Sequence, residues 1–268
     1  ERRPIQRNGN DRTRIYCTIR KQPITMIQLI KGECIEQMKL IPDGSVDAII
    51  TDPPYGTTAC KWDSVIPFDA MWEQLNRIIK PNGAIVLFGA EPFSSTLRVS
   101  NLKNHKYDFV WLKSKSQHFA QAPYRPMTNH EVISVFSFGG TAKNAKNRMK
   151  YNPQGLIPFN KEVKGKKAKH SEHRVRKTDQ KDYIQEFTNY PKTVIKFNNE
   201  GKTVHPTQKP IALMEYLIKT YTNENETVLD FTMGSGSTGV AAKNLNRSFI
   251  GIELDDKYFE IAENRINN

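Results

Sequence analysis

Short apolar runs alternate with segments of helical spacing along most of this 268-residue chain. Apolar and β-branched residues, bounded by polar or turn residues, predict buried strands at 24–30, 46–51, 84–89, 107–112, 132–138, 227–231 and 248–253. Apolar residues at intervals of three and four predict helices at 34–41, 68–79, 92–102, 209–221, 237–245 and 256–266. Residues 81–83, Pro-Asn-Gly, are expected to stop the second helix.

This alternation of strands and helices predicts an α/β fold with a mostly parallel sheet and helices on both faces. The strand at 132–138 is the candidate for an antiparallel partner, because a Gly-Gly break follows it.

Residues 141–204 interrupt the alternation. The interval is polar, basic and rich in Asn, Pro and Lys, which predicts a separate module or a long insertion. The expected division is a basic arm at 1–23, one half of the main domain at 24–140, the insert at 141–204 and the other half at 205–268.

Charge gives this insert a candidate role. The chain carries a net charge of +12, and residues 143–181 hold thirteen Lys or Arg against three acidic residues, hence +10 of that excess. A concentrated basic block favours a polyanion such as nucleic acid, although solvated flexible loops remain the alternative. The candidate nucleic-acid-binding residues are Lys143, Lys146, Arg148, Lys164, Lys166, Lys167, Lys169, Arg174 and Arg176.

Several classes of protein are not expected. No apolar run approaches 18 residues, so no membrane-spanning helix is predicted, and no apolar leader opens the sequence. Cys17, Cys34 and Cys60 are too few and too widely spaced for a disulfide framework or a zinc cluster. We expect no metal and a reducing compartment, either the bacterial cytoplasm, in association with the nucleoid, or a nucleus.

A glycine-rich loop at residues 234–239 follows one predicted strand and opens a helix. Glycines let the backbone approach a ligand, the helix start offers free amides, and Glu253 at the end of the next strand can accept two ribose hydroxyls. Asp230 and Phe231, directly before the loop, suit a cationic ligand that carries an adenine. The loop alone fits a nicotinamide cofactor as well as S-adenosylmethionine.

Asp52, Pro53, Pro54 and Tyr55 follow the strand at 46–51, at the end where open α/β sheets bind their ligands. Consecutive prolines fix the backbone, so the Asp52 carboxylate and nearby carbonyls form a rigid set of acceptors. Such acceptors suit the two N–H groups of an exocyclic base amine, whose lone pair they can direct towards a methyl donor. Tyr55 is expected to stack on a base flipped out of its duplex. An ordinary turn is the alternative for the tetrapeptide alone.

Together these residues resemble the bacterial and phage DNA amino-methyltransferases of the permuted, β-type order. The resemblance lies in Gly32-Glu33-Cys34, in residues 41–55 up to Asp-Pro-Pro-Tyr, in His205-Pro-Thr-Gln-Lys-Pro210, and in Phe231-Thr-Met-Gly-Ser-Gly236. It covers about 24–140 and 203–268 and leaves the basic insert as the counterpart of a target recognition domain.

The resemblance implies a Rossmann-like fold, S-adenosylmethionine as cofactor, and catalysis by Asp52, Pro53, Pro54 and Tyr55. The implied cofactor residues are Glu33, where the family usually has Asp, and Cys34, Thr207, Gln208, Asp230, Phe231, Gly234, Gly236, Ser237, Thr238 and Glu253. Asp at the first position of the tetrapeptide usually accompanies adenine methylation in the family, and Ser accompanies cytosine methylation. Adenine in DNA is therefore the expected target, with cytosine amine or RNA adenine as alternatives.

Two other functions compete: a nicotinamide-dependent oxidoreductase, supported by the glycine loop alone, and a non-catalytic subunit that keeps the fold. A homodimer, a partner subunit and a restriction partner all stay open. Residues 115–125 mix basic residues with Phe119 and Tyr124, which suits a loop near DNA, although core packing of Phe119 is an equal alternative. His130 and Glu131 either help to shape a base pocket or form a structural pair.

Overall fold

A computed structural model of the chain describes residues 26–57, 63–165, 170–171, 174–175, 181–201, 203–205 and 207–268. The predicted arm at 1–23, with Cys17, and also Cys60, lie outside the described residues. The strands of the central sheet are β1 Ile27–Lys31, β2 Val46–Thr51, β3 Ile79–Gly89, β4 His105–Gln117, β5 Thr128–Phe136, β10 Val194–Lys196, β11 Thr227–Asp230 and β12 Ser248–Glu253.

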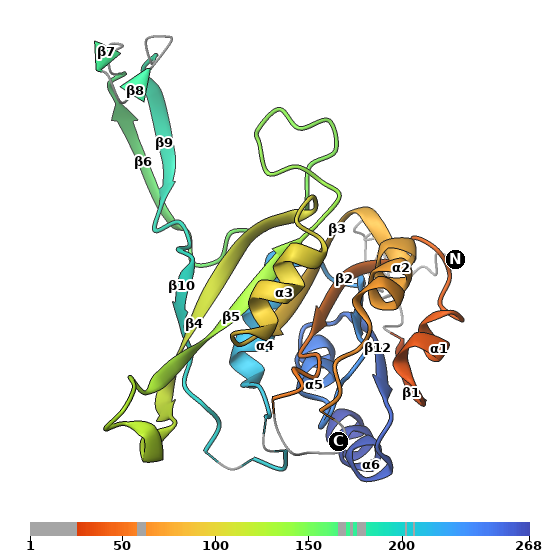
Figure 1. Ribbon diagram of the computed structural model, residues 1–268. Helices are drawn as coiled ribbons and strands as arrows, with labels where there is room; N and C mark the ends of the chain where they lie inside the picture. The colour runs from red at the N-terminus through yellow and green to blue at the C-terminus, as the bar shows by residue number, and fades with distance from the viewer. Residues whose placement is uncertain are drawn as a thin grey trace, which may run out of the picture.

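Their order across the sheet is β1-β12-β11-β2-β3-β5-β4-β10 (Figure 1). β5 runs antiparallel to both of its neighbours, and every other pair is parallel. The expectation of a mostly parallel sheet with one antiparallel strand is therefore confirmed.

Helices cover both faces of this sheet. They are α1 Cys34–Met38, α2 Phe68–Ile78, α3 Phe93–Ser100, α4 Ile211–Tyr221, α5 Ser237–Asn244 and α6 Asp256–Asn267, with a short 3-10 turn, η1, at Phe119–Gln121. Buried residues of α1, α2 and α3 form one apolar cluster with the sheet, and those of α4, α5 and α6 form the other. The predicted α/β fold with helices on both faces is confirmed.

Successive side chains of the central strands belong alternately to the two apolar clusters. In β2, Ala48 and Ile50 belong to the cluster under α4, α5 and α6, whereas Ile49 between them belongs to the opposite one. Successive side chains of a strand point to opposite faces, so a strand covered on both sides is mostly apolar. This explains why β2 has the predicted bounds: all six of its residues are buried. The two polar residues of β2, Asp47 and Thr51, are hydrogen-bonded.

β3 differs from the prediction at its start. Helix α2 ends at Ile78, and the strand begins at once with Ile79, ahead of the expected stop at residues 81–83. Gly83 is needed there because a Cβ atom would lie 2.7 Å from the carbonyl oxygen of Asp47 on β2. The Pro-Asn-Gly segment is thus an irregular part of the strand rather than a turn outside it.

The interval 141–204 has three parts in the structure. Its middle forms a hairpin of β6, Ile157–Val163, and β9, Tyr183–Thr188, with the short pair β7, His170–Ser171, and β8, Arg174–Val175, near the tip. This hairpin projects away from the sheet (Figure 1). Near its end, β10 extends the central sheet beside β4. The start of the interval and β10 therefore pack on the body, and the hairpin alone projects from it.

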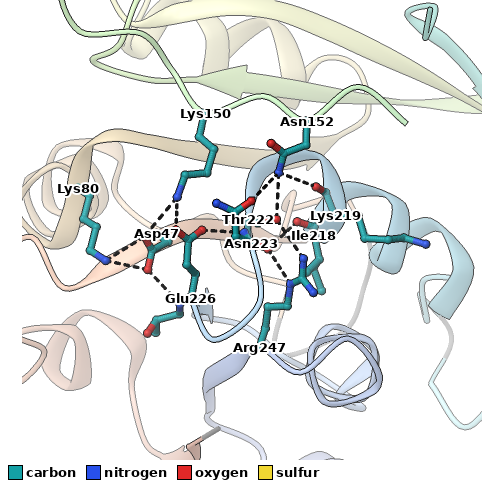
Figure 2. Close-up of polar contacts among 11 residues, drawn as sticks. Asp47, Lys80, Lys150, Asn152, Ile218, Lys219, Thr222, Asn223, Glu226 and Arg247 are labelled. Atoms are coloured by element: carbon teal, nitrogen blue, oxygen red, sulfur yellow. Dashed lines mark hydrogen bonds and ion pairs between the residues drawn. The ribbon is translucent and has the colours of Figure 1, made fainter. Parts of the chain in front are cut away.

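Residues 147–152 hold the start of the insert against the amino ends of the parallel strands (Figure 2). Lys150 forms an ion pair with Glu226 and lies 3.7 Å from the buried carboxylate of Asp47. The Asn152 side-chain amide donates to the carbonyls of Lys219 and Thr222, both at 3.1 Å, at the end of α4. The Lys219 carbonyl lies in the last turn of α4, where it lacks a partner within the helix, so Asn152 satisfies it. The Thr222 carbonyl also accepts the Arg247 guanidinium at 3.0 Å.

None of the helices in the part of the chain that the structure describes is long and apolar enough to cross a membrane.

The Asn152 contacts give a testable prediction for stability. We expect Asn152→Ala to lower the free energy of unfolding by about 1–3 kcal/mol, because it leaves the partly buried Lys219 carbonyl without a donor. Urea unfolding followed by circular dichroism measures the change. Lys146→Ala, at an exposed position in the same segment, is the control and is expected to match wild type. Equal stability of Asn152→Ala and wild type would contradict this anchoring role.

Candidate active site

The predicted site residues follow strands whose carboxyl ends meet at one edge of the sheet. β1, β12, β11 and β2 are adjacent and parallel. Asp52 follows β2, Asp230 ends β11, Glu253 ends β12, and Glu33 comes two residues after β1. Segments far apart in the sequence thus converge at this edge.

A cavity of about 400 Å³ opens between these strand ends. Its lining includes the whole Asp-Pro-Pro-Tyr tetrapeptide and ten of the eleven predicted cofactor residues, namely Glu33, Cys34, Thr207, Gln208, Asp230, Phe231, Gly234, Ser237, Thr238 and Glu253. Gly236 is the exception. It lies at φ +78°, and its amide donates to the Met233 carbonyl at 2.8 Å, so it shapes the turn beneath the cavity.

Asp52 is the central charge of the cavity. One of its carboxylate oxygens accepts the Tyr55 hydroxyl, and the other accepts the Lys209 ammonium. Burial raises the pKa of Asp52 above its ordinary value, and Lys209 offsets only part of that effect. Each carboxylate oxygen has two lone pairs, so both can still accept a hydrogen bond from a ligand.

Tyr55 is held from two sides. Its hydroxyl is on Asp52, and its ring stacks on Phe93 with 5.0 Å between ring centroids. A base that enters the cavity therefore meets the opposite face of the Tyr55 ring. The predicted stacking on a base is limited to that face.

A chain of alternating charges continues from Asp52 into the β4–β5 pair. Lys209 Nζ lies 3.4 Å from Glu131 Oε2 on β5, and Glu131 also pairs with Lys113 on β4. Burial alone would raise the pKa of Glu131, but Lys209 and Lys113 outweigh burial and lower it. Burial would lower the pKa of Lys209, but Asp52 and Glu131 raise it. Two carboxylates and two ammonium groups thus balance in a buried row.

Asp230 connects the glycine loop to the Asp-Pro-Pro-Tyr segment. Its carboxylate accepts the Thr51 hydroxyl at 3.0 Å and the Thr238 hydroxyl at 2.5 Å. Burial raises the pKa of Asp230 to about 7, against the effect of these hydrogen bonds. The neighbouring Thr232 hydroxyl donates to the backbone carbonyl of Asp52 at 3.1 Å. The two predicted motifs are therefore joined by direct contacts.

Glu253 organises the glycine loop. Its carboxylate accepts the backbone amides of Gly234, Leu254 and Asp255 at 2.8 to 2.9 Å. Gly234 lies at φ +52°, a conformation that glycine adopts without strain. Among the described residues no hydrogen-bond partner reaches the buried Ser237 hydroxyl, which faces the same cavity. A ligand there would meet a fixed backbone and an unused hydroxyl.

The remaining predicted cofactor residues form two sides of the cavity. On one side, Glu33 caps α1 by accepting the amide of Glu36 at 2.9 Å, and it also accepts the Cys34 thiol at 3.3 Å. On the other side, the buried His205 ring accepts the Thr207 amide at 3.2 Å. Burial and Lys209 lower the pKa of His205 to about 4, which keeps the ring neutral for this role.

Those predicted basic residues whose side chains the structure describes do not line this cavity. Lys143, Lys146 and Arg148 are exposed, and their segment contacts Pro81 and Asn82 at the start of β3. That edge is one strand length from Asp52, about 20 Å for a six-residue strand. Lys164 is exposed on the insert. Four residues, Lys166, Lys167, Lys169 and Arg176, and the side chain of Arg174, lie outside the described part of the chain.

Sequence reasoning missed Lys209 as a site residue. A lysine two residues before α4 is unfavourably placed near the positive end of the helix, and this position was the available signal that it has a partner elsewhere. Glu131 was considered, but its partners come from β4 and from the segment before α4, which no local pattern connects.

Comparison with known proteins decides the family. A model of the DNA methylase family matches residues 46–264, which is most of the chain. The chain belongs to the DNA methylase family. The type II methyltransferase M.HinfI of Haemophilus influenzae is 28% identical over 89% of the chain and 67% of its own length.

Solved structures agree with this assignment. The structure of an M1.HpyAVI–SAM complex is 30% identical, with a TM-score of 0.58 over 91% of this chain and all of that one. The cytosine-N4-specific PvuII DNA methyltransferase has a TM-score of 0.65 over 90% of this DNA methylase and 87% of its own chain, at 15% identity. The latter likeness concerns the fold alone.

The buried charge row gives a prediction for the pH dependence of stability. We expect Lys209→Met to lower the free energy of unfolding by about 3–5 kcal/mol, because Asp52 and Glu131 lose their shared cation. In the folded variant the pKa of Glu131 then rises above its unfolded value and the already raised pKa of Asp52 rises further, so the folded variant binds more protons and gains stability as pH falls. The deficit relative to wild type is therefore largest near about pH 8 and shrinks towards about pH 5.

Urea unfolding at several pH values measures this difference. Lys39→Met is the matched control, because Lys39 pairs with Glu36 at 2.7 Å on the exposed surface and is expected to behave like wild type at every pH. A Lys209→Met deficit that is constant across pH would show that the lysine contributes by packing rather than by charge.

Proposed function

We propose that this DNA methylase transfers a methyl group from S-adenosylmethionine to the exocyclic amine of adenine in DNA, with the target base flipped out of the duplex. The observation that carries the proposal is the single cavity that joins the Asp-Pro-Pro-Tyr segment to the glycine loop and Glu253. A methyl donor on the loop and an acceptor amine at Asp52 would then share one enclosed space.

The target amine needs hydrogen-bond acceptors more than it needs a group that removes its proton. Its lone pair is delocalised into the ring, so an aminopurine is a weak nucleophile, and its two N–H groups are donors. Asp52 can accept one of them and a backbone carbonyl of the tetrapeptide the other, which directs the nitrogen lone pair towards the methyl donor. Positive charge develops on the nitrogen during transfer, and the Asp52 carboxylate stabilises it electrostatically.

Lys209 and Glu131 set the charge that the amine meets. Lys209 lowers the pKa of Asp52 against the effect of burial and so favours the ionised carboxylate, but its own positive charge opposes the charge that develops on the amine. The Glu131 carboxylate lies 3.4 Å from the Lys209 ammonium and offsets part of its positive charge. Asp52 and Glu131 together exceed Lys209 by one negative charge, and Lys113 on the far side of Glu131 brings the whole row to neutrality. Lys209 and Glu131 therefore act as positioning residues for Asp52.

The cavity fits the cofactor. Its volume of about 400 Å³ lies within the range of about 300–1,000 Å³ that is usual for ligand pockets. Glu253 is placed to accept ribose hydroxyls, while the unused Ser237 hydroxyl and the backbone at Gly234 offer further contacts. Glu33, Cys34 and Phe231 would surround the adenine ring. The cofactor supplies the methyl group on a positively charged sulfur, which suits a cavity lined by Asp52 and Asp230.

The choice of adenine rests on Asp52 at the first position of the tetrapeptide, as in the adenine-specific members that the sequence resembles. The fold does not decide between adenine and cytosine, because the cytosine-specific PvuII enzyme has the same fold. The type II relatives also support a place in a restriction–modification system.

Digestion of treated DNA tests the proposal. Purified protein is incubated with S-adenosylmethionine and unmethylated DNA, in parallel with RNA, and the nucleosides are analysed by mass spectrometry. Adenine methylated on its amine in DNA is the expected result. Methylated cytosine amine would reverse the choice of base, and methylation of RNA alone would reverse the choice of polymer. Thermal stabilisation by NAD but not by S-adenosylmethionine would contradict the cofactor.

The role of Asp52 gives a prediction for a variant. We expect Asp52→Ala to lower the methyl-transfer rate by about a hundredfold or more, because it removes the acceptor that orients the amine. Cofactor affinity, measured by isothermal titration calorimetry, is expected to stay close to that of wild type. Asp69→Ala, at an exposed position on α2, is the control and is expected to retain both. A comparable loss of cofactor affinity in Asp52→Ala would place Asp52 on the donor side instead.

A further inference from the structure

A hairpin arm extends from the active-site edge of the sheet. Residues 114–127, from the end of β4 through η1 to the residue before β5, are all exposed. β4 runs in the same direction as β3 and β2, because β5 is antiparallel to both β3 and β4. The end of β4 therefore points from the same edge as Asp52. The tip lies at the opposite end of the molecule from the β6–β9 hairpin (Figure 1).

The base of this β4–β5 arm is fixed next to the catalytic carboxylate. Lys113 and Glu131 lie where the arm leaves the sheet, and Glu131 reaches Asp52 through Lys209. Ser114 adds a second attachment, because its amide and hydroxyl both bond the Asn199 side chain at 3.1 to 3.2 Å. From Lys113 to Gln117 a strand advances about 13 Å. The arm thus rises beside the opening through which a base would enter.

The arm has the charge of a polyanion-binding surface. No acidic residue occurs in the sequence between Lys113 and His130, whereas Lys115 and Arg125 lie on the arm. Both are exposed. A local excess of positive charge on a segment that leaves the same edge of the sheet as the cavity is complementary to the phosphates that flank a target base.

The arm also exposes two aromatic rings on an ordered backbone. Phe119 is 82% exposed and Tyr124 is 90% exposed, so the core packing considered for Phe119 is not observed. Hydrogen bonds within the tip hold the turn that carries them, with the Tyr124 amide on the Gln121 carbonyl at 2.9 Å and the Arg125 amide on the same carbonyl at 3.0 Å. Exposed rings between basic residues are typical of proteins that stack on bases.

We propose that the β4–β5 arm binds the DNA duplex beside the target base, with Lys115 and Arg125 on phosphates and Phe119 and Tyr124 against bases that flipping leaves unstacked. The proposal rests on the proposed function for the identity of the partner. DNA is favoured over a second copy of the chain because the rings lie among cations and the arm leaves the sheet at the same edge as the cavity.

The role of the two basic residues is tested by a binding measurement that does not require methyl transfer. Binding of Lys115→Gln/Arg125→Gln to a fluorescent 30-base-pair duplex is measured by anisotropy at several salt concentrations. Each phosphate contact contributes about 0.9 to the magnitude of the slope of log affinity against log salt. Loss of two contacts is therefore expected to reduce that magnitude by about 1.8. Lys103→Gln/Lys106→Gln removes the same charge near the start of β4, at the opposite edge, and is expected to keep the wild-type slope.

The role of the two aromatic rings is tested by duplex binding and by the rate of DNA methylation. Phe119→Ala/Tyr124→Ala is expected to bind the duplex about tenfold more weakly and to methylate DNA correspondingly more slowly, with unchanged cofactor affinity and melting temperature. Phe119→Trp/Tyr124→Phe is expected to restore both, because it keeps two rings. Tyr190→Ala, which removes an exposed ring outside the arm, is expected to match wild type.

The outcomes distinguish failure of the proposal for the arm from failure of the proposed function. Wild-type salt slopes in the charge variant, together with wild-type binding in the ring variant, would overturn the proposal. A change in oligomeric state in analytical ultracentrifugation, without a change in duplex binding, would overturn it in favour of a second copy. If the wild-type protein methylates nothing, the proposed function fails, but the slope and the affinity still decide whether the arm binds DNA.

Discussion

The carboxylate of Asp52, whose side chain is only 20% exposed, is the constraint on which the arrangement of the active site depends. A charge removed from water is strongly destabilising unless a partner and hydrogen bonds compensate it. Here Lys209 and the Tyr55 hydroxyl provide that compensation, and Glu131 and Lys113 compensate Lys209 in turn. The row ties together β2, the segment before α4, and the β4–β5 pair. The geometry that makes Asp52 a competent acceptor is therefore also what holds distant parts of the chain in register.

The topology of the sheet explains why the cofactor residues and Asp52 meet. Four adjacent parallel strands end at one edge, and each is followed at once by a turn that carries polar side chains. Apolar clusters on both faces leave this edge as the place where buried polar groups can reach a ligand. Asp230 bonds Thr51 on β2 and Thr238 on α5. It thereby couples the position of the glycine loop to that of the catalytic segment.

The sequence predicted the elements that are buried on both faces better than it predicted exposed ones. β2 and β12 have their predicted bounds, because continuous apolar runs are required there. The extension of β4 to Gln117 and the β6–β9 hairpin were missed, since exposed strands carry no apolar alternation. For the site, the motifs identified residues that one cavity brings together. Lys209 and its link to Glu131 could not be predicted, because an ion pair between residues 131 and 209 depends on the tertiary fold.

The distribution of positive charge has to be considered together with the position of the cavity. The basic residues at 143–148 lie at the amino ends of the strands, where Lys150, Asp47 and Glu226 fasten the insert (Figure 2). A duplex whose target base reaches Asp52 has to contact the opposite edge first, and there the β4–β5 arm is the described segment with exposed cations and rings. Density of charge along the sequence therefore does not indicate which surface lies nearer to the Asp-Pro-Pro-Tyr segment. Position in the fold does: the β4–β5 arm leaves the sheet at the same edge as Asp52, whereas residues 143–148 lie about one strand length away.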